Sequence, residues 1–147
     1  MGIDHCFDRQ RGVVFVVWDG PITWDDWREH VNVLLSDPDW PHTPRFIVDL
    51  QSVTDTSSIK DHEILEVRQV FTSDPAILAG KRTAVVASEQ FRRASRFAEL
   101  VERFGASSIV FNNLDTACLF LGIDLDEARQ TLERLRAELR SRASKTQ

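Results

Sequence analysis

Four short apolar runs, rich in β-branched residues, constrain the fold more than any other feature of this sequence. They are Val13–Trp18, Phe46–Leu50, Arg82–Ala87 and Ser108–Phe111. Runs of this length and composition are typical of strands that are buried on both faces of a sheet. Segments with apolar residues at helical spacing separate or follow these runs. They predict helices over 23–36, 59–71, 88–104 and 114–121.

Strands that alternate with helices predict an α/β fold with a mostly parallel sheet and right-handed crossover connections. We expect helices on both faces of this sheet, because the predicted strands show no alternation of apolar and polar residues. His5–Phe7 and the Arg11–Gly12 turn come just before the first run and predict an antiparallel hairpin. The prediction is therefore one domain with a mixed sheet of about five strands, flanked by helices.

The last part of the sequence predicts a long amphipathic helix. Its apolar stripe steps by three and four residues, as a heptad pattern does, and consists of Leu125, Ala128, Leu132, Leu135 and Leu139. We expect an α/β domain over 3–123 and this helix over 124–147. The spacing leaves two arrangements open, since the helix either packs on its own domain or contacts a second copy. Symmetric dimers are the commonest assembly, so we expect a homodimer that uses Leu125, Leu132, Leu135 and Leu139.

The composition argues against several classes of function. The net charge of -5 argues against binding to nucleic acid through a basic surface. The two cysteines, Cys6 and Cys118, are too few for a disulfide framework and favour a reducing, cytoplasmic location. No apolar run approaches the ~18 residues that a membrane span requires, and the first residues do not form a signal peptide.

Several short stretches give the sequence a resemblance to a known family. They are Gly20–Thr23, Ser36–Pro38, Ile47–Leu50, Arg82–Ala87, Arg96–Phe97, Val110–Phe111 and Ala117–Gly122. Their order resembles the STAS-like fold of anti-sigma-factor antagonists, the SpoIIAA-like group, and in particular its small bacterial members. The resemblance covers about residues 5–123. It implies a bacterial, cytoplasmic module that acts in regulation or protein–protein interaction and not in catalysis, with a biochemical role that is otherwise unassigned.

The same resemblance directs attention to the residues between the second run and the helix after it. In antagonists of this group, a serine that follows an aspartate here is phosphorylated, and the phosphate controls binding to a kinase-like anti-sigma factor. Counting from Asp49, Thr56 takes the place of that serine, and Ser57 takes the next place. Ser58 stands where a glycine usually follows. A helix N-terminus tolerates a phosphate, so we expect a phospho-acceptor or partner-binding loop at Asp55, Thr56, Ser57 and Ser58.

These four residues also fit a purely structural role. Ser58 is a suitable N-cap for the predicted helix, and Asp61 would complete a capping box with it. Ser, Thr and Asp are the residues that most often cap helices and form polar turns. The sequence leaves both interpretations open.

A cluster of arginines indicates an alternative function. Arg92, Arg93 and Arg96 lie in the first turns of the helix predicted over 88–104, where the helix dipole disfavours cations. Arginine suits bidentate contact with a phosphate or carboxylate. Trp40 lies between two prolines, and we place it at the rim of a groove or interface. The alternative prediction is a groove near Trp40 and Arg96 that binds a small anionic or lipid-like ligand.

Catalytic and metal-binding motifs are missing from the sequence. The four histidines lack metal-ligand spacing, and there is no glycine-rich phosphate loop or G-x-S-x-G motif. We therefore expect no enzyme activity, no metal and no cofactor. The expected partner is another protein or a second copy of this chain.

Overall fold

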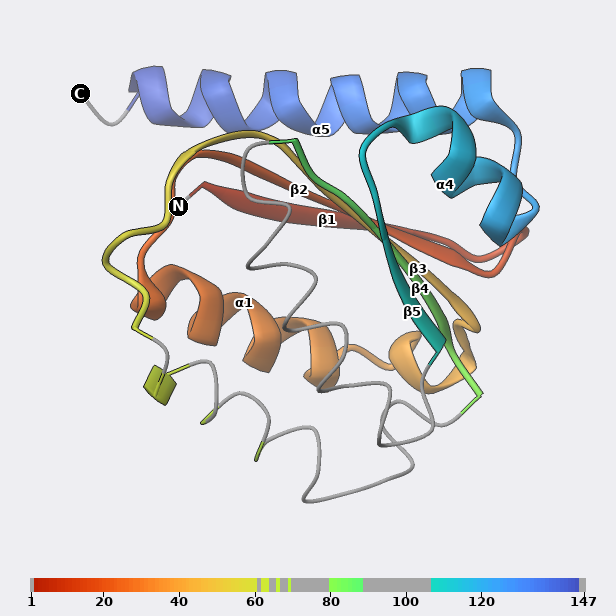
Figure 1. The fold of residues 1–147 in the computed structure, drawn as a ribbon, viewed down its shortest axis with the longest axis horizontal. Coiled ribbons are helices and arrows are strands. Elements are labelled where there is room, and N and C mark those ends of the chain that lie inside the picture. The colour runs from red at the N-terminus through yellow and green to blue at the C-terminus, as the bar shows by residue number, and fades with distance from the viewer. Residues whose placement is uncertain are drawn as a thin grey trace.

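The computed structural model describes residues 2–60, 62, 63, 66, 69, 80–88 and 107–145. They form a five-stranded sheet with helices on both faces (Figure 1). The strands are β1 (Ile3–Asp8), β2 (Val13–Pro21), β3 (Arg45–Asp55), β4 (Arg82–Val86) and β5 (Ser107–Phe111). They lie in the order of the sequence, with β1 antiparallel to β2 and the other neighbours parallel. The predicted mixed, mostly parallel sheet is confirmed.

Helices cover the two faces of the sheet unequally in the described part of the chain. α1 (Trp24–Ser36) lies on one face, and α4 (Leu114–Leu121) and α5 (Leu125–Lys145) lie on the other (Figure 1). A short 3-10 helix, η1 (Trp40–His42), leads from α1 towards β3. The helices that the sequence predicts over 59–71 and 88–104 fall mostly outside the described residues.

α1 begins at the predicted capping box. The Thr23 hydroxyl accepts a hydrogen bond from the N–H of Asp26 at 3.2 Å, and the Asp26 carboxylate accepts one from the N–H of Thr23 at 3.1 Å. Each bond satisfies a backbone donor that has no partner inside the helix. The acidic residues of this first turn also suit the positive end of the helix dipole.

Two strands are longer than the sequence predicts. β2 continues to Pro21 and β3 continues to Asp55, although the residues after Leu50 are mostly polar and read as a loop. The extensions pair with each other, with Asp19 opposite Ser52 and Pro21 opposite Asp55. Backbone hydrogen bonds between neighbouring strands do not depend on side-chain polarity, so an apolar pattern alone underestimates the length of these strands.

Alternate residues of the strands enter two separate cores. The core under α1 contains Val14, Val16, Val48 and Val85 from the strands, with Val31 and Leu34 from the helix. The core under α4 and α5 contains Val13, Phe15, Val17, Ile47, Ala84 and Val86, with Cys118, Leu121 and the leucines of α5. Side chains on successive strand residues point to opposite faces, which explains why the apolar runs show no polar alternation.

The leucine stripe of α5 is buried within the single chain. Leu132, Leu135 and Leu139 are 2%, 3% and 4% exposed, and they pack on the face formed by β1, β2 and α4. Leu125 is half-buried against the same core. The prediction that these leucines form a dimer contact is therefore wrong, because the sheet and α4 of the same chain already cover their side chains. Whether the chain forms a homodimer through another surface stays a prediction.

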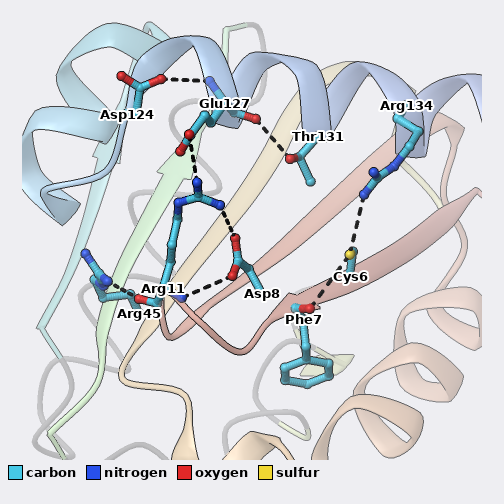
Figure 2. Close-up of polar contacts among 9 residues, drawn as sticks. All are labelled: Cys6, Phe7, Asp8, Arg11, Arg45, Asp124, Glu127, Thr131 and Arg134. Carbon is cyan, nitrogen blue, oxygen red and sulfur yellow. Dashed lines mark hydrogen bonds and ion pairs between the residues drawn. The ribbon is translucent and has the colours of Figure 1, made fainter.

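Polar contacts also fix the first half of α5 to the β1–β2 turn (Figure 2). The Arg11 guanidinium lies 2.7 Å from the Asp8 carboxylate and 2.7 Å from the Glu127 carboxylate. Arg45 donates to the carbonyl of Arg11. The Asp124 carboxylate accepts from the N–H of Glu127 at 3.0 Å, as an N-cap does. The turn and the helix start are thus held to each other by charge as well as by apolar packing.

Candidate functional site

The carboxyl ends of β2 and β3 meet the C-terminal half of α5 at one end of the sheet (Figure 1). Open α/β sheets bind ligands and partners at the carboxyl ends of their parallel strands. Two features lie at this end: the loop that follows β3, and a set of Asp–Arg pairs between the strands and α5. We call residues Asp55–Lys60 the Asp55 loop.

The Asp55 loop is anchored at both ends. The carbonyl of Asp55 accepts a hydrogen bond from the N–H of Ile22 at 2.9 Å, and the Ser58 hydroxyl donates to the carbonyl of Ile22 at 3.4 Å. Ile59 is 4% exposed in the core under α1. The buried Ile59 side chain and the two bonds to Ile22 fix the path of the loop, so its exposed residues are presented in a defined arrangement.

Asp55 holds Ser57 through a hydrogen bond to its backbone. The Asp55 carboxylate accepts from the N–H of Ser57 at 2.8 Å, the geometry of an Asx turn. The Ser57 side chain is the main reason that the pKa of Asp55 lies below its ordinary value of 3.8, and the Ser57 N–H acts in the same direction. Ser57 and Ser58 are exposed, whereas Thr56 is half-buried. Of the two predicted acceptor positions, Ser57 therefore has the more accessible hydroxyl.

Lys60 brings a positive charge to the same loop. Its ammonium donates to the carbonyl of Ser57 at 3.3 Å. Its backbone N–H donates to the Glu63 carboxylate at 2.8 Å, which is the reach-back bond of a capping box. Residues 59 and 60 are not helical, residues 62 and 63 are, and the Ser58 hydroxyl donates to the carbonyl of Ile22. The interpretation of Ser58 as the N-cap is therefore wrong.

A buried ion pair joins β3 to α5. Asp49 is 2% exposed, and its carboxylate lies 2.5 Å from the guanidinium of Arg136. The same carboxylate accepts from the N–H of Gln51 at 2.9 Å. Burial raises the pKa of Asp49 above its ordinary value, although both of these donors act in the opposite direction. The Arg136 Nε is buried without a hydrogen-bond partner.

The sequence contains a signal for this pair that belongs to no catalytic or binding motif. Asp49 interrupts the apolar run Phe46–Leu50, and an aspartate is almost never buried without a partner. A carboxylate inside a predicted core strand thus predicts a buried cation. The identity of that cation was not predictable, because Arg136 lies 87 residues further along the chain.

Two further pairs connect the strands to the end of α5. Arg140 donates to both carboxylate oxygens of Asp19, at 3.2 and 3.0 Å. Arg142 pairs with Asp4 on β1. Both arginine side chains are mostly exposed, so water screens these pairs far more than the Asp49–Arg136 pair. The three pairs neutralise carboxylates on β1, β2 and β3 with arginines from one helix.

The side chain of Trp40 does not line a ligand groove. Trp40 is 3% exposed and packs edge-to-face on Phe46, with ring centroids 5.5 Å apart. The Lys81 ammonium lies 4.4 Å from the centre of the indole and donates to the carbonyl of Trp40 at 2.6 Å. The expectation that Trp40 lies at the rim of a groove is therefore wrong, because η1 turns the indole into the core.

The remaining predicted contacts cannot be placed. Arg92, Arg93 and Arg96 lie outside the residues that the structure describes.

Among the described residues, no three His, Cys, Asp or Glu side chains are close enough together to hold a metal ion. Burial raises the pKa of the Cys118 thiol to about 11, which leaves it protonated and unreactive. None of the described helices combines the length and the apolar character needed to cross a membrane.

Comparison with solved structures identifies the fold. The chain is similar to an uncharacterized protein of the DUF3478 family from Shewanella loihica PV-4, which has a SpoIIAA-like fold. The TM-score is 0.54 at 14% identity, and the match covers 82% of this chain and 94% of that chain. No family model and no curated protein matches the sequence. The architecture is thus STAS-like, as the resemblance implied, and at this identity the likeness shows the fold alone.

Proposed function

We propose that this chain is a non-enzymatic regulatory or interaction module of the STAS-like fold, and that its partner binds at the Asp55 loop. One observation carries the proposal. Ser57 is exposed, and its N–H is held by the Asp55 carboxylate in a loop that the buried Ile59 fixes in place. A fixed and exposed polar loop at the carboxyl end of a parallel sheet is suited to recognition. A bacterial, cytoplasmic setting belongs to the same proposal.

The loop also supports regulation by phosphorylation at Ser57. A phosphate adds roughly -1.5 to -2 charges and three acceptor oxygens. On Ser57 it would lie close to the Asp55 carboxylate that holds the Ser57 N–H, and two anionic groups in contact repel each other. Lys60, whose ammonium already bonds to the Ser57 carbonyl, is placed to pair with the phosphate instead. Phosphorylation would therefore change both the charge and the hydrogen bonds of the surface that the partner meets.

The polar groups at this end of the sheet support a binding role over a catalytic one. The buried carboxylate of Asp49 is occupied by Arg136 and Gln51, and Asp19 is occupied by Arg140. A general acid or base needs a titratable group within reach of a substrate. In the described part of the chain, these carboxylates instead hold α5 to the sheet.

Capture of partners from a lysate of the native host tests the proposal. Wild type, Ser57→Ala and Ser57→Asp are used as bait, with Gln130→Glu as the control that adds one negative charge at an exposed position on α5. We expect a protein that wild type, Ser57→Ala and Gln130→Glu capture and that Ser57→Asp fails to capture. Thermal melting of each variant confirms that the bait is folded.

Intact-mass measurement of the protein from its native host, before and after phosphatase treatment, reports the modification directly. If Ser57→Asp captures the same proteins as wild type, the Asp55 loop is not the partner surface. If partners depend on Ser57 but the native protein carries no phosphate, the loop binds without phosphorylation.

A further inference from the structure

The two outer strands of the sheet differ in charge. Among the described strands, β1 and β5 each pair with one neighbour only. β1 carries Asp4 and Asp8, both engaged by arginines. β5 has the sequence SSIVF, and Asn112 and Asn113 follow it, so residues 107–113 contain no ionisable side chain. Proteins commonly protect an outer strand with charged residues, because its free N–H and C=O groups pair readily with another strand. β5 lacks this protection.

Two exposed apolar side chains lie on β5 and on the helix that packs against it. The described residues include three large exposed apolar side chains: Val33, Ile109 and Leu119. Ile109 is the central residue of β5 and is 43% exposed. It lies opposite Ala84 of β4, and thus on the face of the sheet that α4 covers. Leu119 is 80% exposed on α4, which packs on β4 and β5.

We propose that β5 pairs with β5 of a second copy of this chain, in antiparallel register about a two-fold axis at Ile109. In that register Ile109 lies opposite its own copy, Ser107 lies opposite Phe111, and Ser108 lies opposite Val110. The two five-stranded sheets join into one continuous sheet across the axis. Each exposed Ile109 side chain is covered by its equivalent, on the face that also carries Leu119.

The lack of charge favours a second copy over another occupant. A two-fold axis places identical residues opposite or near each other, so any charged residue close to the axis meets the same charge. Each chain has a net charge of -5, and two copies repel each other except where the surface is neutral. Residues 107–113 are such a surface, whereas β1 carries the charged side chains of Asp4 and Asp8 together with their arginine partners. Self-pairing also satisfies the outer backbone groups of both strands at once.

Mass measurement in solution tests the proposal. Light scattering after size exclusion, over a series of concentrations, is expected to show a dimer for wild type and a monomer for Ile109→Lys, which places two ammonium groups at the axis. Val33→Lys is the matched control, because Val33 is 52% exposed and lies on α1, on the opposite face. It is expected to remain dimeric. A wild-type chain that is monomeric at every concentration overturns the proposal, and so does a dimer that persists in folded Ile109→Lys.

Cross-linking tests the register independently of any loss of folding. Directly opposite residues in antiparallel strands have Cβ atoms ~5 Å apart, close to the separation in a disulfide. In a Cys6→Ser background, Ile109→Cys is expected to form a disulfide-linked dimer under mild oxidation, while Val33→Cys stays unlinked. Ser108→Cys is expected to link only when mixed with Val110→Cys. Efficient linking of Ser108→Cys to itself, or no linking of Ile109→Cys, contradicts the register.

Discussion

The guanidinium of Arg136 on α5 lies 2.5 Å from the carboxylate of Asp49 on the central strand β3, and Asp49 is 2% exposed. This contact makes the long helix part of the sheet's own core rather than an appendage to it. It also divides the arginines of α5 into one that is largely buried and others that are exposed. We therefore expect substitutions of the buried arginine and of the exposed arginines to lower the free energy of unfolding by different amounts.

Removing Arg136 is expected to destabilise the protein strongly. Arg136→Met leaves the Asp49 carboxylate buried without its cation, and we expect the free energy of unfolding in urea to fall by about 3 kcal/mol. Arg140→Met, the same substitution one turn further along α5, is expected to have a much smaller effect, because the Asp19–Arg140 pair is screened by water. Equal losses for the two variants would contradict the special role of the buried pair.

Replacing both members of the pair is expected to restore most of the stability. Asp49→Leu with Arg136→Met substitutes apolar contact for two buried charges, and such replacements are often neutral or stabilising. The coupling between the two positions follows from a double-mutant cycle that includes Asp49→Leu alone. A double variant as unstable as the sum of the single variants would show that the pair is not coupled.

His30 is expected to make the protein sensitive to mild acid. It is 6% exposed on α1, with its ring 5.2 Å from that of His5, and burial lowers its pKa from 6.5 to about 4. The unfolded chain therefore binds a proton more readily than the folded chain between these two values. Stability is fully present above pH 6.5 and is lost as the pH falls towards 4, by up to about 3 kcal/mol.

Unfolding in urea at several pH values measures this effect. His30→Leu is expected to flatten the dependence between pH 6.5 and 4, and His42→Leu, at an exposed position, is the control for replacing a histidine with leucine. Paired carboxylates contribute to acid sensitivity in all variants, so the difference between wild type and His30→Leu is the quantity to compare. Parallel curves for these two proteins would exclude His30 as the cause.

The leucines of α5 are expected to stabilise the single chain. Leu135 is 3% exposed in the core under α4 and α5, so Leu135→Ala leaves a cavity and should cost about 3 kcal/mol. Because the stripe packs on its own sheet, this loss should not depend on protein concentration. A loss that disappears on dilution would instead place Leu135 in a contact between copies.

Lys81 is expected to act as a structural cation. It is 5% exposed, and its ammonium bonds to the carbonyls of Trp40 and Thr43 while lying over the Trp40 ring. Lys81→Met keeps the aliphatic chain but removes the ammonium from both carbonyls, and only the Trp40 carbonyl keeps another donor, the N–H of Thr43. We therefore expect a loss of about 2 kcal/mol. Lys145→Met, at an exposed position, is the control and should melt at the temperature of wild type.

The sequence is most informative where a feature depends on neighbouring residues. The apolar runs predict the sheet, and Thr23 with Asp26 predicts the start of α1, because strands and caps are defined over a few residues. The heptad spacing of α5 does not distinguish packing on its own sheet from packing on a second copy, since both require the same apolar stripe. The choice depends on the distant strands β1 and β2.

Other predictions from the sequence are wrong because tertiary contacts override the local pattern on which they rest. Residues 51–55 look like a polar loop, yet they extend β3 because the end of β2 pairs with them. Trp40 looks exposed between two prolines, yet η1 carries it into contact with Phe46 and Lys81. The Asp55 loop was located from the family resemblance, whereas the accessibility of Ser57 relative to Thr56 needed the structure.

The ion pair between Arg142 and Asp4 joins residues 138 positions apart, and α5 covers strands from the beginning of the sequence. During synthesis the β1–β2 hairpin therefore emerges long before the helix that covers one of its faces. Until α5 has left the ribosome, Val13, Phe15 and Val17 lack the leucines that bury them. A fold completed by such distant contacts is expected to form slowly, and to expose the apolar face of the hairpin until α5 has been synthesised.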